Sequence, residues 1–125
     1  MDYVKPTQLI EDVAHAGAYK STLKISDILI KGILSGAFLG FATTLAFTAA
    51  IETNLSIVGA LVFPVGFVLI LLLSLELVTG NFAMLPLARI RNLTTSNDVV
   101  YNFFWAFLGN LLGSLLYGLF FYIVT

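Results

Sequence analysis

The segment LSLELVTGNFAMLP, from Leu73 to Pro86, decides the fold because it sets a carboxylate inside one of the most apolar stretches of the chain. Glu76 lies within it, and the turn-forming run Thr79–Asn81 begins three residues later. An ionised side chain near the centre of a bilayer costs at least about 2.5–3.5 kcal/mol, so Glu76 requires polar partners. The segment therefore predicts an irregular, polar feature at membrane depth.

The apolar stretch around this segment, from Leu55 to Ile90, has an awkward length. It is too long for one upright helix at about 1.5 Å per residue, and too short for two full spans of about 20 residues each. Two prolines and the Gly80–Asn81 pair interrupt it. We expect a helix broken at mid-membrane, with a segment over about 57–75, a non-helical link over 76–82 and a short segment to about residue 90. Such a break is tolerated only where it is buried in protein or lines a wet cavity.

The composition is that of a membrane protein. The chain has 125 residues, of which 59% are hydrophobic and 10% charged, and its mean hydropathy is +1.00. A soluble domain of this size could not bury that much apolar surface. The net charge of −1 gives no indication of nucleic-acid binding.

The residues present predict no enzyme, no metal site and no cofactor. The chain has no cysteine, which excludes disulfides, thiol nucleophiles and cysteine-ligated metals. His15 is the only histidine and lies in the polar N-terminal stretch. Neither a zinc site nor a nucleophile–base pair is therefore expected in the apolar part.

Residues 25–125 are predicted to form a membrane domain of three helical spans, at about 28–50, 57–90 (broken) and 99–124. Small residues recur at close spacing in the first and third spans, a pattern that lets helices approach closely. These residues are Gly32, Ser35, Gly36, Ala37, Gly40, Gly109, Gly113, Ser114 and Gly118. In the polar stretch 1–24 we expect an amphipathic helix on the cytoplasmic face, with a frayed, solvated tail as the alternative.

With three crossings, every basic residue falls on the same side of the membrane. The basic residues are Lys5, Lys20, Lys24, Lys31, Arg89 and Arg91. The positive-inside rule then places the N-terminus in the cytosol and the C-terminus outside. We expect an integral protein of a bacterial-type inner or plasma membrane.

The polar residues of the break have both structural and functional interpretations. Glu76, Gly80 and Asn81 would organise the link, with the carboxylate accepting hydrogen bonds from backbone N–H groups of residues 78–82. The alternative is that Glu76 titrates or meets a permeant species. Thr79 would face a cavity, where its hydroxyl can donate to an anion beside the positive end of the following helical segment. Capping that segment is compatible with this role.

Three stretches carry a family resemblance: VAHAGAYKSTLK (13–24), VFPVGFVLILLLSLELVTGN (62–81) and NFFWAFLGNLLGSLL (102–116). They resemble the N-terminal motif, the first signature and the third helix of the formate/nitrite transporter family, a group of anion channels. The resemblance implies half of an aquaporin-like fold, which has six spans in two inverted repeats and assembles as a pentamer with a pore in each subunit. It also implies that Phe63 and Leu77 line hydrophobic constrictions and that the Thr79 hydroxyl faces the pore.

The function implied is permeation of a small monovalent anion, such as formate or nitrite. The resemblance covers about the first half of a family member, and the family's central histidine and second signature belong to the fourth and fifth spans. We therefore expect this chain to be inactive alone, as a fragment, a truncated gene product or a subunit that needs a partner of opposite charge bias. The alternative is a small non-transporting membrane assembly or interaction subunit that uses its glycine-rich helix faces.

Overall fold

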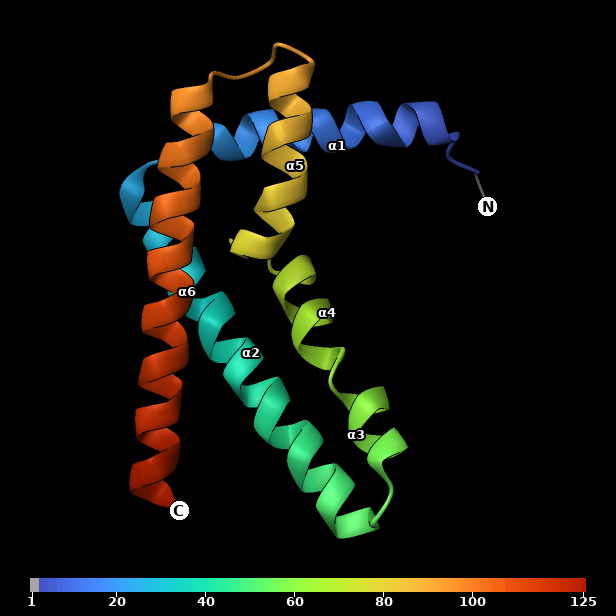
Figure 1. Ribbon diagram of the computed structural model, residues 1–125, viewed down its shortest axis with the longest axis vertical. Helices are drawn as coiled ribbons and strands as arrows, with labels where there is room; N and C mark the ends of the chain where they lie inside the picture. The colour runs from blue at the N-terminus through green and yellow to red at the C-terminus, as the bar shows by residue number, and fades with distance from the viewer. Residues whose placement is uncertain (1–2) are drawn as a thin grey trace.

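The computed structural model describes residues 3–125, and all the regular secondary structure in that range is helical (Figure 1). The helices follow one another with short connections. They are α1 (Pro6–Ser21), α2 (Ile25–Thr53), α3 (Ser56–Val62), α4 (Val65–Leu72), α5 (Val78–Ile90) and α6 (Ser96–Val124).

The two long helices, α2 and α6, pack against each other near one end of the molecule and diverge toward the other (Figure 1). α3, α4 and α5 form a second, interrupted path that returns from the far end of α2 to the start of α6. α1 lies across the end where α5 finishes and α6 begins, and it packs mainly on α5. The C-terminus lies at the opposite end from α1.

Small residues form the contact between α2 and α6, as their spacing predicts. A Cβ atom built on Gly32 would lie 3.1 Å from the Cα of Gly109. One built on Gly36 would collide with the backbone carbonyl of Asn110, and one built on Gly113 would collide with that of Ile33. The close approach of the two backbones therefore requires glycine at positions 36 and 113 and leaves little room for a side chain at position 32.

The returning path is broken as expected, but the break lies earlier in the chain than the predicted link over 76–82. α4 ends at Leu72, and α5 starts at Val78, so the link is 73–77. Leu77 is extended, and the N–H of Asn81 already donates to the Leu77 carbonyl at 3.0 Å. The run Thr79–Asn81 is therefore helical. Glycine inside a helix costs only about 1 kcal/mol, so Gly80 does not by itself force a turn.

The segment predicted over 57–75 is also divided, into α3 and α4, at Pro64. Proline has no N–H to donate and its ring clashes with the preceding turn, which explains the interruption. Pro86, by contrast, lies inside α5 without ending it.

The N-terminal segment contains a helix, which favours the first of the two expectations for that stretch. Within α1, the buried residues are Ala14 and Gly17, and Gly17 lies against the backbone of Met84 in α5. Leu9 and Ile10 are exposed, so an apolar strip remains uncovered by protein. Contact of this strip with the cytoplasmic membrane face stays a prediction, and residues 1 and 2 of the predicted segment lie outside the described range.

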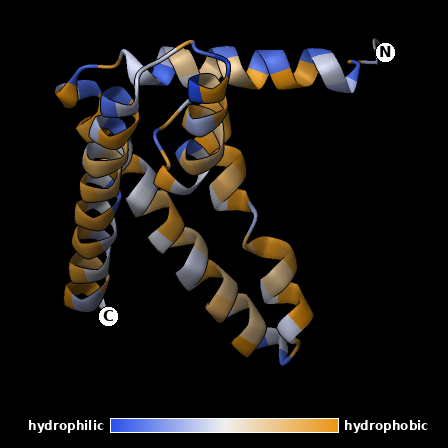
Figure 2. Ribbon diagram, turned by 45° about the horizontal axis from the view of Figure 1, so that its top comes forward, coloured by the Kyte–Doolittle hydropathy of each residue, from blue (hydrophilic) through white to orange (hydrophobic). Residues whose placement is uncertain are grey.

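Two helices, α2 and α6, are long and apolar enough to cross a membrane, while α3 and α4 together form a shorter apolar stretch. Most of their large apolar side chains are exposed. Figure 2 shows hydrophilic residues gathered around α1 and the connection between α5 and α6. These features agree with a helical membrane protein.

Candidate functional site

The break between α4 and α5 is the most polar place in the interior of the structure. Glu76 lies in the link and is 1% exposed, although it is a charged residue. Ser74 in the same link has a φ of 51°, in the left-handed region, so the chain turns sharply there. Groups from four helices converge on this link.

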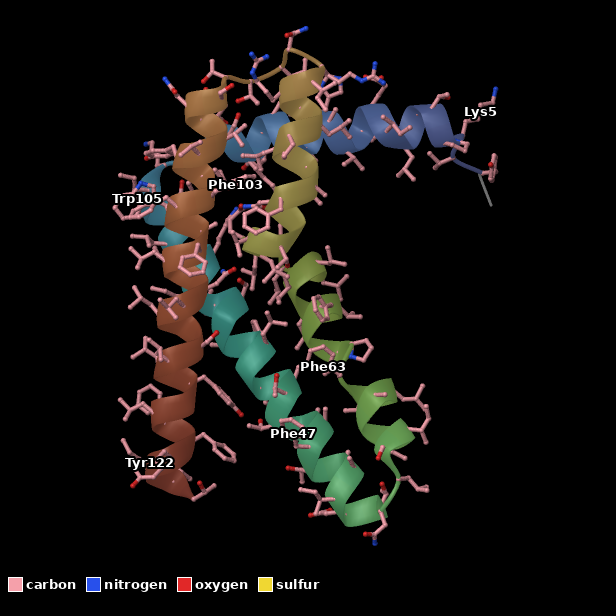
Figure 3. The ribbon with its side chains drawn as sticks, in the orientation of Figure 1. Lys5, Phe47, Phe63, Phe103, Trp105 and Tyr122 are labelled. Carbon is pink, nitrogen blue, oxygen red and sulfur yellow. The ribbon has the colours of Figure 1, made fainter. Side chains whose placement is uncertain are left out.

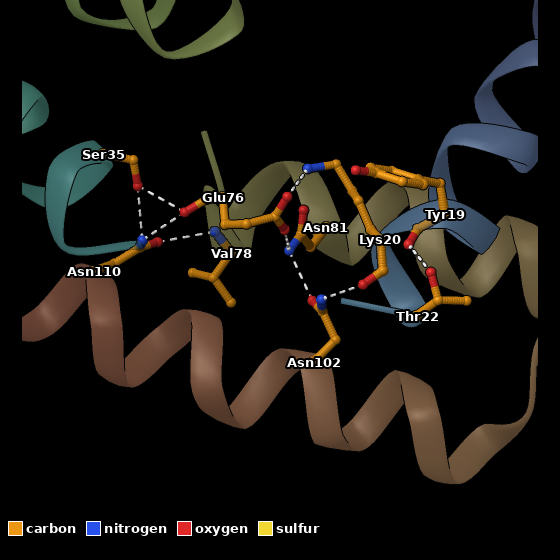
Figure 4. A network of polar contacts seen from close by, with 9 residues as sticks. All are labelled: Tyr19, Lys20, Thr22, Ser35, Glu76, Val78, Asn81, Asn102 and Asn110. Carbon is orange, nitrogen blue, oxygen red and sulfur yellow. Dashed lines mark hydrogen bonds and ion pairs between the residues drawn. The ribbon is translucent and has the colours of Figure 1, made fainter. Parts of the chain in front are cut away.

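Two side chains hold the carboxylate of Glu76 (Figure 4). Lys20 Nζ, at the end of α1, lies 2.6 Å from Glu76 Oε1. Asn81 Nδ2, one turn into α5, donates to Glu76 Oε2 at 2.8 Å. The predicted partners, the backbone N–H groups of residues 78–82, are therefore not the groups that satisfy this carboxylate.

A second asparagine closes the network between the link and α1. Asn81 Nδ2 also donates to Asn102 Oδ1 at 2.7 Å, and Asn102 Nδ2 donates to the carbonyl oxygen of Lys20 at 3.0 Å. Lys20 thus contributes both its ammonium and its carbonyl. Asn81 and Asn102 are 1% and 0% exposed, so the network is inside the protein. Asn81 Oδ1 is buried and has no hydrogen-bond partner.

Asn110, in α6, takes the place of helical hydrogen bonds across the break. Its Oδ1 accepts from the N–H of Val78 at 2.9 Å, and its Nδ2 lies 2.8 Å from the carbonyl oxygen of Glu76. Ser35 Oγ, in α2, donates to the same Glu76 carbonyl at 2.7 Å. Buried backbone groups released by a broken helix need such partners, because leaving one unpaired costs about 1–3 kcal/mol.

An open cavity of about 590 Å³ lies beside the break. α1, α2, α4, α5 and the link all contribute to its wall. Among the residues predicted to matter, Glu76, Leu77, Thr79, Gly80 and Asn81 line it.

Phe63 does not line this cavity. It lies at the junction of α3 and α4 (Figure 3), where its ring meets that of Phe67 edge-on with centroids 5.5 Å apart. Phe67 does line the cavity. The two aromatic rings therefore connect the Phe63 position to the cavity wall.

The cavity wall carries a hydroxyl group and two lysine side chains in addition to Glu76 and Asn81. Thr79 lies in the first turn of α5, where N–H groups lack helical partners and the helix dipole is positive. Lys20 and Lys31 also line the cavity. Within residues 3–125, no group of three or more histidine, cysteine, aspartate or glutamate side chains could hold a metal ion.

Lys20, Asn102 and Asn110 belong to this candidate site and were not predicted from the sequence. One signal was available for the asparagines: both are amides inside an apolar helix, and they lie eight residues apart on one face. No local pattern relates Lys20 to a carboxylate 56 positions later.

Comparison with known proteins gives one family. The family model for the formate/nitrite transporter matches residues 7–125. The chain is 33% identical over 121 residues to the formate channel BtFdhC of Bacillus thuringiensis, covering 92% of this chain and 47% of that protein. It is 31% identical over 127 residues to the uncharacterized transporter YrhG of Bacillus subtilis (strain 168), covering 97% of this chain and 48% of that protein.

The chain thus spans about half the length of the curated relatives that it matches. No solved structure matches it.

Proposed function

Because this chain belongs to the formate/nitrite transporter family, we propose that it forms the first half of a transmembrane path for small monovalent anions such as formate or nitrite. The family consists of transporters, so the protein acts in moving a solute across the membrane rather than in an enzymatic reaction. The observation that carries the proposal is the broken path between α4 and α5, with a buried carboxylate in the link and a cavity beside it.

In the proposed path, apolar and polar groups alternate. Leu77 lines the cavity and forms a dry constriction, in which a bare anion is costly. Phe63 forms a second constriction on the far side of Phe67. Thr79 lies two residues after Leu77 and lines the same cavity, so its hydroxyl can donate to an anion leaving the dry zone. Glu76, Gly80 and Asn81 shape the link, and the bonds of Glu76 to Lys20 and Asn81 support that role.

The membrane arrangement that fits this path has three crossings, formed by α2, by α3 to α5 together, and by α6. It corresponds to one repeat of an aquaporin-like fold whose second, inverted repeat supplies the opposite wall. Sites in such proteins lie where the two repeats meet near the midplane. We expect the cavity to be completed by a second half, and the whole to assemble as a homo-oligomer, a pentamer by analogy with the family. The chain alone is then inactive.

The proposed setting is a bacterial-type inner or plasma membrane, with α1 on the cytoplasmic face. The basic residues favour this orientation, because none lies in the connection between α2 and α3 at the opposite end.

Anion flux into proteoliposomes tests the function. This chain, the chain joined to a family second half, and empty vesicles would be compared by uptake of labelled formate. Uptake only with the joined protein, and its loss on Leu77→Asp, supports the proposal. A joined protein that inserts and folds but takes up no more formate or nitrite than empty vesicles contradicts it.

The rival function is a non-transporting assembly subunit that binds partners through glycine-rich helix faces. The packing of the glycines in α2 and α6 disfavours this function. The glycines that such a subunit would bury, Gly36, Gly40, Gly109 and Gly113, already lie in the contact between α2 and α6. Gly118, which has nothing within 4 Å, is the exception in α6.

A further inference from the structure

We propose that Lys31 is a second cationic residue of the cavity and binds the small anion there, apart from the ion pair between Lys20 and Glu76. The inference rests on the proposed anion path and names a residue that contacts the anion within it. It comes from three observations: the position of Lys31 on α2, its lack of a partner and the charge balance of the cavity.

Lys31 faces the broken link by its place on α2. Ser35, four residues later, donates a hydrogen bond to the Glu76 carbonyl at 2.7 Å. Residues four apart lie on the same face of a helix, one above the other. Lys31 therefore lies one turn from the Ser35 contact, on the side toward α1, and it lines the same cavity as Lys20, Glu76 and Thr79.

Lys31 forms no ion pair with any residue in the range 3–125. Within residues 3–125 the ion pairs are Lys20 with Glu76 and Arg91 with Glu11, and Lys31 takes part in neither. Lys31 is half-buried. It is the seventh residue of α2, about 9 Å along the helix axis from the first residue. An ammonium inside an apolar helix is expensive where it meets lipid, and such groups are functional candidates when they face a cavity.

The charged residues that line the cavity are Lys20, Lys31 and Glu76. Glu76 compensates Lys20 at 2.6 Å, so the ammonium of Lys31 leaves the cavity with one net positive charge. Thr79, which also lines the cavity, adds a hydroxyl donor at the positive end of α5. A small monovalent anion suits this set, because one charge matches one cation and the hydroxyl can donate to it.

Lys20 and Lys31 would thus have different roles, although both are lysines in one cavity. Lys20 holds the break through Glu76 and through its own carbonyl. Lys31 makes no such bond and is available to a ligand.

Anion binding to the purified full chain in maltoside micelles tests the inference without requiring transport. The probe is carbon-13 formate, whose NMR line broadens when it exchanges with a site on the protein. Wild type, Lys31→Met, Lys31→Arg and Lys24→Met would be compared, with helix content checked by circular dichroism. Lys24 is the matched control, because it is an exposed lysine at the start of α2 that does not line the cavity.

We expect saturable broadening in wild type and Lys24→Met, about tenfold weaker apparent affinity in Lys31→Met, and recovery in Lys31→Arg. Equal affinity in wild type and Lys31→Met overturns the inference, and so does the absence of saturable broadening in folded wild type. Lys31 would then only extend toward the membrane surface. Binding without flux in proteoliposomes leaves the inference standing while the function proposed for the path is judged by its own assay.

Discussion

Lys20 Nζ lies 2.6 Å from Glu76 Oε1, and this pair joins the end of α1 to the break between α4 and α5, 56 residues later. The side chains are 16% and 2% exposed, so the charges are largely removed from water. The buried carboxylate is thus tolerated because a basic residue reaches it from the end of the molecule where α1 lies. The N-terminal helix is thereby part of the site rather than an appendage.

Breaking this pair should destabilise the fold. Glu76→Gln leaves the Lys20 ammonium without a counter-charge, and Lys20→Met leaves the carboxylate without one. Removing one partner of a buried pair costs about 3–5 kcal/mol, because the remaining charge is uncompensated. The double variant should be more stable than the sum of the two losses indicates. Thermal unfolding of the four proteins in detergent, treated as a double-mutant cycle, measures this coupling.

The pair between Arg91 and Glu11 is the control. Its side chains are 46% and 48% exposed, at a separation of 2.7 Å. Exposed pairs contribute about 0–1 kcal/mol. Arg91→Gln should therefore lower the unfolding temperature far less than Glu76→Gln. Similar decreases in the unfolding temperature of both variants would show that burial does not make the Lys20–Glu76 pair more stabilising than an exposed pair.

The need for polar partners at Glu76 could be predicted from the sequence, but their identity could not. A carboxylate in an apolar stretch has to be satisfied, and this alone identifies the break. Its partners are set by how α1 and α6 pack around the link, which is tertiary information. Lys20 and Asn102 lie far away in sequence and share no local pattern with Glu76.

The position of the break shows a second limit of local signals. Thr79–Asn81 has turn chemistry, yet it forms the first turns of α5, because Asn81 bonds to both Glu76 and Asn102 from inside the helix. The apolar residues Leu73, Leu75 and Leu77 form most of the link instead. The start of α5 is thus set by tertiary hydrogen bonds rather than by the turn propensity of Thr79–Asn81. By contrast, the glycine spacing predicted the contact between α2 and α6, since close approach depends directly on side-chain size.

Asn110 should hold the break in shape more than any other single amide. Asn110→Leu keeps a similar volume but removes the acceptor for the Val78 N–H and a donor for the Glu76 carbonyl. The Glu76 carbonyl keeps its bond from Ser35, but the buried N–H of Val78 is left unpaired, which costs about 1–3 kcal/mol. We expect lower thermal stability and faster deuterium exchange confined to residues 73–80. Asn97→Leu, at an exposed position at the start of α6, is the control. Unchanged exchange over 73–80 in Asn110→Leu contradicts the assigned role.

The contact between α2 and α6 should be intolerant of a single methyl group. Gly36→Ala places a Cβ against the Asn110 carbonyl, a backbone atom that cannot rotate away. Overpacking of this kind costs about 1–3 kcal/mol. Gly118→Ala is the matched change, because nothing lies within 4 Å of its Cβ position, and alanine favours a helix by about 1 kcal/mol. Opposite shifts in unfolding temperature are expected. A Gly36→Ala protein as stable as Gly118→Ala would contradict the packing described.

The one-sided distribution of basic residues predicts a single orientation in the membrane. Lys20, Lys24 and Arg91 lie near the end of the molecule that α1 covers. The connection between α2 and α3, at the other end, has no basic residue. Two copies of this chain could build a symmetric path only by inserting in opposite directions. The positive-inside rule opposes this, because one copy would have to carry the basic end across the membrane.

Cysteine labelling in bacterial cells decides between one orientation and two, and the chain is well suited to it because it has no cysteine of its own. Asn54→Cys, in the connection between α2 and α3, should react fully with a membrane-impermeant maleimide added outside. Asn92→Cys, in the connection between α5 and α6, should react only after the cells are opened. Each site is the control for the other. Partial labelling of both sites in intact cells would show mixed insertion, and the chain could then pair with an inverted copy of itself.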